Sequence, residues 1–315
     1  MEYILEIKNL NLFFGEYQAL YDINLKLQKG KMHALVGESG CGKTMTAMSI
    51  IRLLPKGAKI TTGEIIFNGK NLLEYKESQM RTLRGNNIAL IPQDPMTSLN
   101  PLYTVGNQLI ESIRTHSNVS YHSAKRKAKE VMDLVKIPDI DSKINFYPHE
   151  FSGGMKQRII IAMALATNAE LLIADEPTTA LDVTIQKQIM DLIDEIKKEF
   201  NRTILLISHD LAMVSNYTDY VSVMYSGHIV EESPSNSFFA FPMHPYSQAL
   251  INSLPTTNPA YKLKTIEGAP PTIQEEITGC KFYPRCSLFK EGLCNKENPV
   301  LKERTQNHYS ACLVR

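Results

Sequence analysis

A glycine-rich stretch between an apolar segment and a helical one constrains the fold of this chain most. Residues 37–44 read Gly-Glu-Ser-Gly-Cys-Gly-Lys-Thr and fit the pattern G-x-x-x-x-G-K-[ST], whose backbone wraps around phosphate groups. The apolar run 32–36 predicts a buried strand before it, and residues 45–54 predict a helix after it. A glycine-rich turn that arose by chance would lack this context. The sequence therefore predicts a strand–loop–helix unit that binds phosphate.

The residue types in this loop suit phosphate chemistry. Glycines let backbone N–H groups turn inward, and the start of the helix adds partial positive charge. Lys43 is expected to reach the β- and γ-phosphates, and Thr44 to place its hydroxyl on Mg²⁺. The expected phosphate-binding set is Gly37, Ser39, Gly40, Cys41, Gly42, Lys43 and Thr44.

The composition of the 315 residues is that of a globular protein, with 43% hydrophobic and 21% charged residues. A net charge of +1 gives no field that would favour nucleic acid. The first residues lack the basic and apolar regions of a signal peptide. The longest apolar run, 159–166, is shorter than the roughly 18–20 residues that span a bilayer. We therefore expect a cytosolic chain that reaches a membrane only through a partner.

Polar residues that suit a nucleotide site follow three more predicted strands. Apolar runs predict these strands over 87–92, 170–175 and 203–207. The first leads to Gln93, the second ends in Asp175 with Glu176 directly after it, and the third leads to His209. Adjacent residues of a strand point apart, so Asp175 can face Mg²⁺ while Glu176 faces a water. Each would be an ordinary strand end in isolation, but the phosphate loop upstream favours a shared site for all of them.

The residues alone leave two alternative interpretations for each of two further features. Phe14, or Tyr17, suits stacking on an adenine, and equally suits a core or edge-strand aromatic. The run Ser152-Gly153-Gly154 suits an anion-binding helix start, but taken alone an ordinary helix cap explains such a run more often.

Helical patterns fill two other stretches. Between about 94 and 150, Thr104 and Ser123 are expected to cap two helices of a compact insertion. Residues 182–200 carry an apolar stripe at helical spacing. Residues 220–230 predict a closing hairpin around a Ser-Gly turn.

Beyond about residue 232, prolines become frequent and periodicity fades, which predicts an appended module. Four of the five cysteines lie there, namely Cys280, Cys286, Cys294 and Cys312. In a reducing compartment such clustering favours metal or cluster ligation over disulfides. The spacing matches neither the C-x₂-C of zinc ribbons nor a bacterial ferredoxin run. Structural cysteines without a ligand therefore remain an alternative.

The order of these features resembles that of ATP-binding-cassette (ABC) ATPases. After the phosphate loop come Gln93, Ser152-Gly153-Gly154, Asp175-Glu176, Ala180-Leu181-Asp182 and His209. Residues 93–101, 244–246 and 267–271, with the cysteines that follow, narrow the resemblance to the ATPase subunit of an oligopeptide/dipeptide or nickel importer. Phe151 and Met155 depart from the family signature Leu-Ser-Gly-Gly-Gln, and this variant suits the peptide-importer branch.

The resemblance implies an α/β fold with a P-loop NTPase core of the RecA type and a β-rich N-terminal subdomain, over 1–93 and 159–232. It implies an inserted helical signature subdomain over 94–158. It also implies an oligopeptide-importer-type extension with four cysteines over 233–315.

The resemblance also assigns roles within one subunit. Lys43 binds phosphate, and Thr44 and Asp175 hold Mg²⁺. Gln93 contacts Mg²⁺ and the attacking water, and Glu176 is the general base.

Other implied roles involve the γ-phosphate and a dimer. His209 senses the γ-phosphate, and Asp182 acts across a dimer interface. Ser152, Gly153 and Gly154 would bind the γ-phosphate of the ATP held by the opposite subunit. Family members work as dimers with two ATP molecules between facing subunits.

The implied function is ATP hydrolysis that energises an ABC importer of di- and oligopeptides. The alternatives are a nickel or metal-chelate importer of the same family and a soluble non-transport ABC ATPase. The implied partners are a second ABC ATPase subunit in a heterodimer with a paralogue, two transmembrane permease subunits and, indirectly, an extracytoplasmic solute-binding protein. The implied location is peripheral, on the cytoplasmic face of the cell membrane. For the four cysteines, the resemblance ranks a [4Fe–4S] cluster above Zn²⁺.

Rival function classes fit the residues less well. A cassette ATPase that acts on nucleic acid or ribosomes would favour basic patches or tandem cassettes. A nucleotide-binding regulator without turnover would not need Glu176 and His209. A GTPase would need Asn-Lys-x-Asp, and the nearest match, at 295–298, ends in Asn298.

Overall fold

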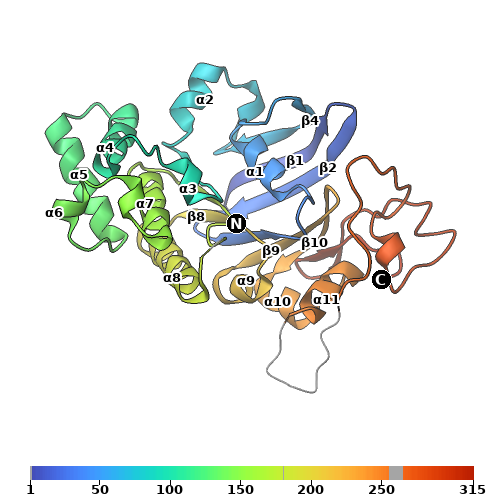
Figure 1. Cartoon of the computed structure of the whole chain (residues 1–315). Coiled ribbons are helices and arrows are strands. Elements are labelled where there is room, and N and C mark those ends of the chain that lie inside the picture. The colour runs from blue at the N-terminus through green and yellow to red at the C-terminus, as the bar shows by residue number, and fades with distance from the viewer. Residues whose placement is uncertain (1, 180, 255–264) are drawn as a thin grey trace. The chain divides into compact units, whose positions relative to one another are not determined.

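The computed structural model describes residues 2–179, 181–254 and 265–315. The chain forms two compact units, which Figure 1 colours by residue number. The first unit comprises residues 1–73 and 207–315, and the second comprises residues 74–206. The chain passes from the second unit back to the first within β8 (Thr203–Ser208).

The first unit contains a four-stranded antiparallel sheet near its N-terminus. Its strands, in spatial order, are β2 (Tyr17–Gln28), β1 (Tyr3–Phe14), β4 (Ala58–Phe67) and β5 (Lys70–Asn71). Leu5 pairs with Leu27 and Leu12 pairs with Leu20 across β1 and β2, and all four side chains are fully buried. Because side chains alternate between the faces of a strand, this pattern places one face of the sheet in the core.

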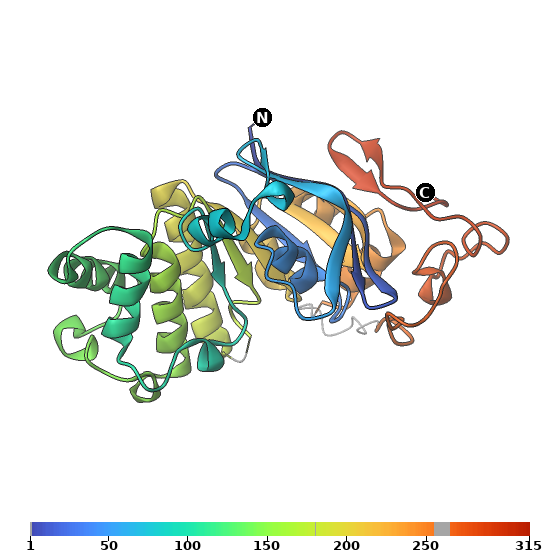
Figure 2. The ribbon, with the colours of Figure 1, turned by 90° about the horizontal axis from the view of Figure 1, so that it is seen from above.

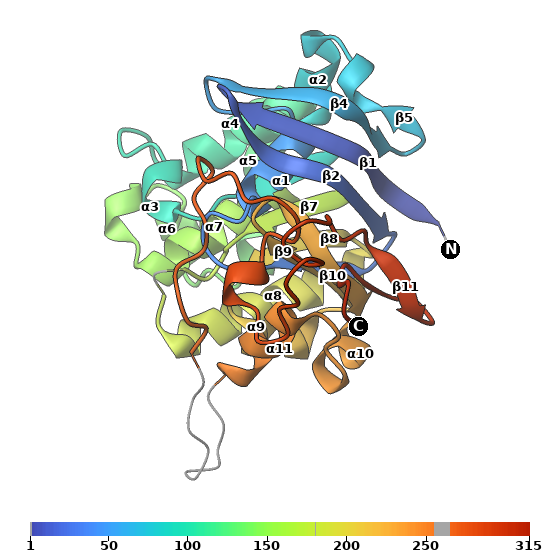
Figure 3. The same cartoon turned by 90° about the vertical axis from the view of Figure 1, so that its right-hand side faces the viewer.

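The phosphate loop follows a strand of a second sheet. The strands of this sheet in the first unit are β3 (Met32–Val36), β9 (Tyr220–Tyr225), β10 (His228–Pro234), β12 (His308–Ser310) and β11 (Lys302–Thr305). β3 runs parallel to β9, and the remaining neighbours pair antiparallel. Every residue of β3 is buried, and the predicted hairpin over 220–230 is confirmed. The C-terminal hairpin of β11 and β12 was not predicted, and it extends this sheet beside β10 (Figure 3).

Short helices complete the first unit. They are α1 (Lys43–Ile50), α9 (Leu211–Tyr217), α10 (Ser235–Ala240), α11 (Pro245–Asn252) and the 3₁₀ turn η3 (Tyr283–Arg285). The helix predicted over 45–54 begins earlier, at Lys43, and ends at Ile50. It stops there because Arg52 adopts a φ of 52°, which a right-handed helix excludes.

The second unit is mainly helical, and besides the first part of β8 its described residues include two strands that pair in parallel. These are β6 (Ile88–Ile91) and β7 (Leu171–Asp175), with Ile88 opposite Leu171. The helices are α2 (Glu77–Leu83), α3 (Pro95–Ser98), α4 (Val105–His116), α5 (Tyr121–Leu134), α6 (Ile140–Lys143), α7 (Gly153–Leu165) and α8 (Val183–Phe200), with 3₁₀ turns η1 (Leu72–Glu74) and η2 (Pro148–Glu150). α7 packs against α4, α5, α8 and β6, and Figure 2 shows the green and yellow helices side by side.

Side-chain caps start several of these helices, as the sequence predicts. Thr104 accepts a hydrogen bond from the backbone N–H of Asn107 at the start of α4. The cap predicted at Ser123 is wrong, because α5 begins three residues earlier and its cap is Ser120, which accepts from the N–H of Ser123. The helix predicted over 182–200 is confirmed as α8, with Asp182 as its cap.

Among the described residues, no helix has both the length and the apolar character that a membrane crossing requires.

Candidate nucleotide-binding site

The phosphate loop has backbone angles that only glycine adopts easily. Gly37, Gly40 and Gly42 have φ values of 149°, 79° and 108° between β3 and α1. A Cβ atom at Gly37 would lie 2.2 Å from the carbonyl oxygen of Met224 and 2.8 Å from the Cys41 sulfur. Both conformation and space therefore require glycine at this position.

Lys43 is folded back over the loop. Its side chain is buried, and its ammonium donates to the carbonyl oxygens of Gly37 at 2.9 Å and Glu38 at 3.0 Å. The sulfur of Cys41 lies 3.8 Å from the same nitrogen. Burial raises the pKa of the Cys41 thiol although Lys43 opposes the shift, so this cysteine stays protonated at neutral pH. The loop thus presents a fixed positive charge beside its backbone N–H groups.

The second unit holds the acidic residues that the sequence singled out. Asp175 ends β7 and is 3% exposed, and Glu176 follows with a φ of 46°. The side-chain amide of Gln93 donates to one oxygen of Glu176 at 3.0 Å, and the hydroxyl of Thr179 donates to the same oxygen at 3.0 Å. The structure therefore brings together the predicted water-contacting amide and the predicted general base.

The signature segment begins α7 as the sequence predicts. The hydroxyl of Ser152 accepts from the N–H of Met155 at 3.4 Å. A Cβ at Gly154 would lie 2.7 Å from Ile185, so the packing of α7 on α8 requires this glycine. A Cβ at Gly153 would meet Leu181 at 3.5 Å, an ordinary contact distance. Packing within the chain therefore explains Gly154 and leaves Gly153 without a structural reason.

The remaining predicted residues lie at helix starts and strand ends. Asp182 accepts from the N–H of Ile185 at 3.0 Å, so it has a structural role as a cap. His209 follows β8, and Asp210 caps α9 directly after it. Ala180, part of the family pattern, lies outside the described residues.

The two aromatic candidates for adenine binding are both exposed. Phe14 is 44% exposed and Tyr17 is 42% exposed, and the two residues pair across the turn between β1 and β2. The interpretation of either ring as a core residue is therefore wrong, and an edge position or a stacking platform remains.

The four late cysteines interact with one another. Burial, with the neighbouring thiols of Cys286, Cys294 and Cys312, raises the pKa of Cys280 to about 11. The backbone N–H of Cys280 donates to the carbonyl of Cys294 at 2.9 Å, and the sulfur of Cys286 accepts from the N–H of Leu288 at 3.4 Å. All four are free thiols. Even so, the part of the chain that the structure describes contains no group of three or more His, Cys, Asp or Glu side chains that could hold a metal ion. The expected Zn²⁺ or iron–sulfur site is therefore not supported by the structure.

The donor set for Mg²⁺ is chemically suitable. Mg²⁺ prefers oxygen ligands and binds in nucleotide sites through one or two carboxylates together with phosphates. Within the second unit, Asp175 supplies a buried carboxylate and Gln93 an amide oxygen, and both are oxygen ligands of the kind that Mg²⁺ binds. In the first unit, the hydroxyl of Thr44 is an oxygen donor of the same kind.

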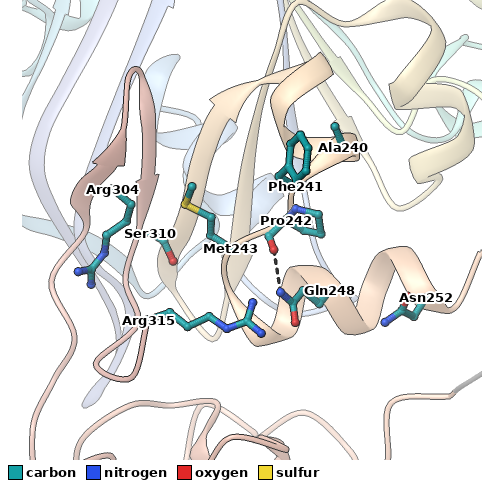
Figure 4. Close-up of a pocket in the computed structure, with 9 residues that line it drawn as sticks. All are labelled: Ala240, Phe241, Pro242, Met243, Gln248, Asn252, Arg304, Ser310 and Arg315. Atoms are coloured by element: carbon teal, nitrogen blue, oxygen red, sulfur yellow. Dashed lines mark hydrogen bonds between the residues drawn. The ribbon is translucent and has the colours of Figure 1, made fainter.

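A pocket of about 540 Å³ lies elsewhere in the first unit (Figure 4). Its lining residues are Ala240, Phe241, Pro242, Met243, Gln248, Asn252, Arg304, Ser310 and Arg315. None of the residues predicted to bind ATP lines this pocket.

Sequence reasoning missed three residues that fix the conformation of the phosphate loop. Glu38 lies within the loop, while Tyr246 and Arg285 come from the C-terminal extension and bind it. No local motif marks these residues. The sequence offers one signal, which is that the acidic residue Glu38 lies inside a loop that binds phosphate and therefore needs a neutralising partner.

Two models of known protein families match parts of this chain. A family model described as ABC transporter matches residues 20–179. A second model, described as the C-terminal region of oligopeptide/dipeptide transporters, matches residues 230–294.

Relatives of known name align along nearly the whole chain. A probable peptide ABC transporter ATP-binding protein of Sinorhizobium fredii is 49% identical, over 98% of this chain and 94% of the relative. The oligopeptide transport ATP-binding protein OppD of Bacillus subtilis is 44% identical, over 97% of this chain and 87% of the relative. The dipeptide transport ATP-binding protein DppD of the same organism is 42% identical, over 99% and 95%.

Solved structures of similar fold are ABC cassettes. The cassette MJ0796, in a dimeric post-hydrolysis state bound to ADP and Pi, has a TM-score of 0.66 and 25% identity, and the match covers 73% of this chain and 98% of that one. CbiO1 of Clostridium perfringens, part of the transporter complex cbiONQ, has a TM-score of 0.66 and 26% identity, with coverage of 76% and 92%.

Proposed function

This chain belongs to the ABC transporter family, in its oligopeptide/dipeptide branch, and on that basis we propose that it hydrolyses ATP to drive peptide import through permease subunits in a membrane. The names of the relatives favour peptides over nickel as the cargo. They also favour a transporter subunit over a cassette ATPase that works without a membrane.

The hydrogen bond between Gln93 and Glu176 carries the catalytic part of this proposal. Hydrolysis of a phosphoanhydride needs a positioned water and neutralised charge more than covalent chemistry. A carboxylate oriented by an amide suits the general base, and the amide suits a contact to the same water. We assign Glu176 as the base, Gln93 as the water-positioning residue and His209 as the contact to the γ-phosphate.

Lys43 and the backbone N–H groups of residues 37–42 would bind the phosphates, and Phe14 would stack on the adenine. Thr44, Asp175 and Gln93 would hold Mg²⁺. Bound there, the ion supplies neutralisation of the negative charge that develops on the phosphate oxygens.

We further propose that each ATP-binding site is completed by a second ATPase subunit, which is a paralogue of this chain. Ser152, Gly153 and Gly154 would bind the γ-phosphate held by that subunit, and Asp182 would act across the interface. Packing within the chain does not require a glycine at position 153, which supports this role. A helix start without side chains lets an anion approach the backbone N–H groups.

The expected surroundings follow from family membership. The helical segment 94–158 would engage two transmembrane permease subunits, and the chain would lie on the cytoplasmic face of the cell membrane. An extracytoplasmic solute-binding protein would deliver the peptide. No part of the proposal involves nucleic acid.

A separate proposal concerns the four late cysteines and the iron–sulfur cluster that they would bind. In a [4Fe–4S] cluster each cysteine binds a different iron, so the thiols need not surround a single ion. The N–H of Cys280 donates to the carbonyl of Cys294, and after burial the thiols of Cys286, Cys294 and Cys312 further raise the pKa of Cys280, which supports the proximity of the four cysteines. We propose that such a cluster stabilises the extension. Anaerobic purification that yields a brown protein with about four irons per chain would support it, and a colourless, iron-free protein would contradict it.

Peptide uptake by the assembled transporter tests the main proposal. The full chain is co-purified with its membrane subunits and placed in lipid vesicles. ATP hydrolysis and uptake of a labelled peptide should rise together, and both should be lost in a matched complex that carries Glu176→Gln. ATP-dependent uptake of Ni²⁺ with no uptake of peptide would favour the nickel alternative. Hydrolysis by a chain that never co-purifies with membrane subunits would contradict a transport role.

A further inference from the structure

An arginine of the C-terminal extension binds a glutamate of the phosphate loop. One guanidinium nitrogen of Arg285 lies 2.7 Å from an oxygen of Glu38, and the other lies 3.0 Å from the second oxygen. The two residues are 247 positions apart in the sequence. The side chain of Arg285 is only 5% exposed, and that of Glu38 is 26% exposed. Paired bonds of this kind between charged groups fix both position and orientation.

A second residue of the extension holds the backbone of the same glutamate. The N–H of Glu38 donates to the hydroxyl of Tyr246 at 2.9 Å. Tyr246 is fully buried, and its ring packs against Phe282 with 5.3 Å between ring centroids. Phe282 also meets Tyr225 edge-on at 5.1 Å, and the Tyr225 hydroxyl accepts from Arg285 at 3.3 Å. The contacts to Glu38 therefore rest on a packed aromatic group rather than on mobile side chains.

Glu38 is thus held at three points. Its carbonyl oxygen accepts from Lys43, its N–H binds Tyr246 and its carboxylate binds Arg285. The first contact comes from the loop itself, whereas the other two come from the extension.

The carboxylate of Glu38 creates an electrostatic problem for a loop that binds phosphate. A negative charge within a loop that binds a polyphosphate repels the ligand, and the repulsion grows where water is partly excluded. Arg285 neutralises this charge and fixes the carboxylate against the extension. The same ion pair therefore removes the repulsion and attaches the phosphate loop to the C-terminal extension.

We propose that Arg285 and Tyr246 are positioning residues for the phosphate loop, through which the C-terminal extension sets the affinity of the chain for MgATP. Neither residue needs to touch the nucleotide. This inference rests on the proposed function in one respect, because it takes MgATP as the ligand of the loop.

Removal and rescue of the charge test this role. MgATP binding is measured by titration calorimetry on the full chain in the wild type and in Arg285→Ala, Glu38→Gln and the double variant. Arg285→Ala should bind about tenfold more weakly, since it leaves an uncompensated carboxylate in the loop. The double variant should bind within about threefold of Glu38→Gln, because the charge that Arg285 compensates is gone. Lys302→Ala, which removes an exposed cation of β11 in the same extension, should bind like the wild type.

A purely structural role for Arg285 predicts a different result. Loss of packing would weaken binding equally in Arg285→Ala and in the double variant, and that outcome would overturn the inference. Wild-type affinity in Arg285→Ala would overturn it as well. Tyr246→Phe keeps the ring and removes only the acceptor of the Glu38 N–H, so it should weaken binding while the nucleotide-free chain stays folded at the temperature of the titration, which thermal unfolding checks. A wild-type chain that binds no MgATP would contradict the proposed function itself, whereas failure of the rescue alone contradicts only the role of the extension.

Discussion

The side-chain amide of Gln93 donates a hydrogen bond of 3.0 Å to the carboxylate of Glu176. The hydroxyl of Thr179 donates to the same oxygen at 3.0 Å, so two neutral donors fix that oxygen. Gln93 is the second residue after β6, and Glu176 directly follows β7, so the contact joins the ends of two neighbouring strands. A strand end of this kind offers a carboxylate in a defined orientation, as proton abstraction from a water requires.

Replacement of this carboxylate should separate binding from turnover. We expect Glu176→Gln to retain MgATP binding and to lower the steady-state hydrolysis rate at least about a hundredfold, the usual contribution of a general base. Phosphate release by the transporter complex measures the rate. The control is Glu199→Gln, the same substitution at an exposed residue near the end of α8. Hydrolysis close to the wild-type rate in Glu176→Gln would exclude this residue as the base.

The two glycines of the signature segment should respond differently to alanine. Gly153→Ala has room within the chain, so the melting temperature should change little, while ATP turnover of the assembled dimer should fall more than about tenfold because the methyl group obstructs a phosphate. Gly154→Ala should also lower the melting temperature, because its Cβ would press on Ile185. Thermal unfolding and hydrolysis are measured on both variants. Unchanged turnover in Gly153→Ala would contradict a phosphate contact at this position.

The exposed aromatic pair offers a matched test of adenine stacking. Phe14→Ala should weaken ATP binding by about tenfold, the usual effect of losing one base–aromatic stack. Tyr17→Ala, equally exposed and directly opposite on β2, should have little effect. Triphosphate alone should bind both variants with equal affinity, since it has no base. A larger loss of ATP affinity in Tyr17→Ala than in Phe14→Ala would show that Tyr17, and not Phe14, stacks on the adenine.

A buried histidine should make the chain less stable in acid. His244 is 1% exposed, and burial lowers its pKa from 6.5 to about 4. The unfolded chain therefore takes up this proton first as the pH falls, so the stability that is fully present above pH 6.5 is lost progressively down to about pH 4.

The variant His244→Asn should reduce this loss. Asparagine retains a side-chain acceptor for the N–H of Tyr246, which His244 binds at 3.1 Å, and it does not titrate. The slope of the unfolding free energy between these pH values should become shallower by up to about 1.4 kcal/mol per pH unit. Denaturant unfolding at a series of pH values measures the slope. His33, whose pKa burial also lowers to about 4, should leave part of the acid dependence in place. Identical slopes in the two proteins would show that His244 does not contribute.

Features encoded by neighbouring residues were predicted well. The phosphate loop, the strand before it and the cap at Thr104 each depend on a short run of sequence whose residues interact locally. The order of the site residues along the chain was enough to indicate the ABC family. Local reasoning placed the cap of α5 at Ser123 rather than Ser120, because both serines precede apolar periodic residues.

Features that depend on distant residues were not predicted. β11 is exposed along its whole length, so no alternation of apolar residues marks it as a strand. The contact between Glu38 and Arg285 joins segments 247 positions apart, and neither side carries a motif. The early end of α1 depends on the left-handed conformation of Arg52, a residue type with high helix propensity.

The sequence separation of Glu38 and Arg285 also orders events on the ribosome. At roughly 5–20 residues per second, the loop is translated about 12–50 s before the arginine that neutralises its carboxylate. Once β9, the partner of β3, has been made, the nascent chain would still carry a phosphate loop with reduced affinity for nucleotide until Arg285 is added. Tight ATP binding would then mark a chain whose last segment has been made and folded. The extension would act as an assembly checkpoint, which keeps incomplete subunits from loading nucleotide and competing for a place in the transporter.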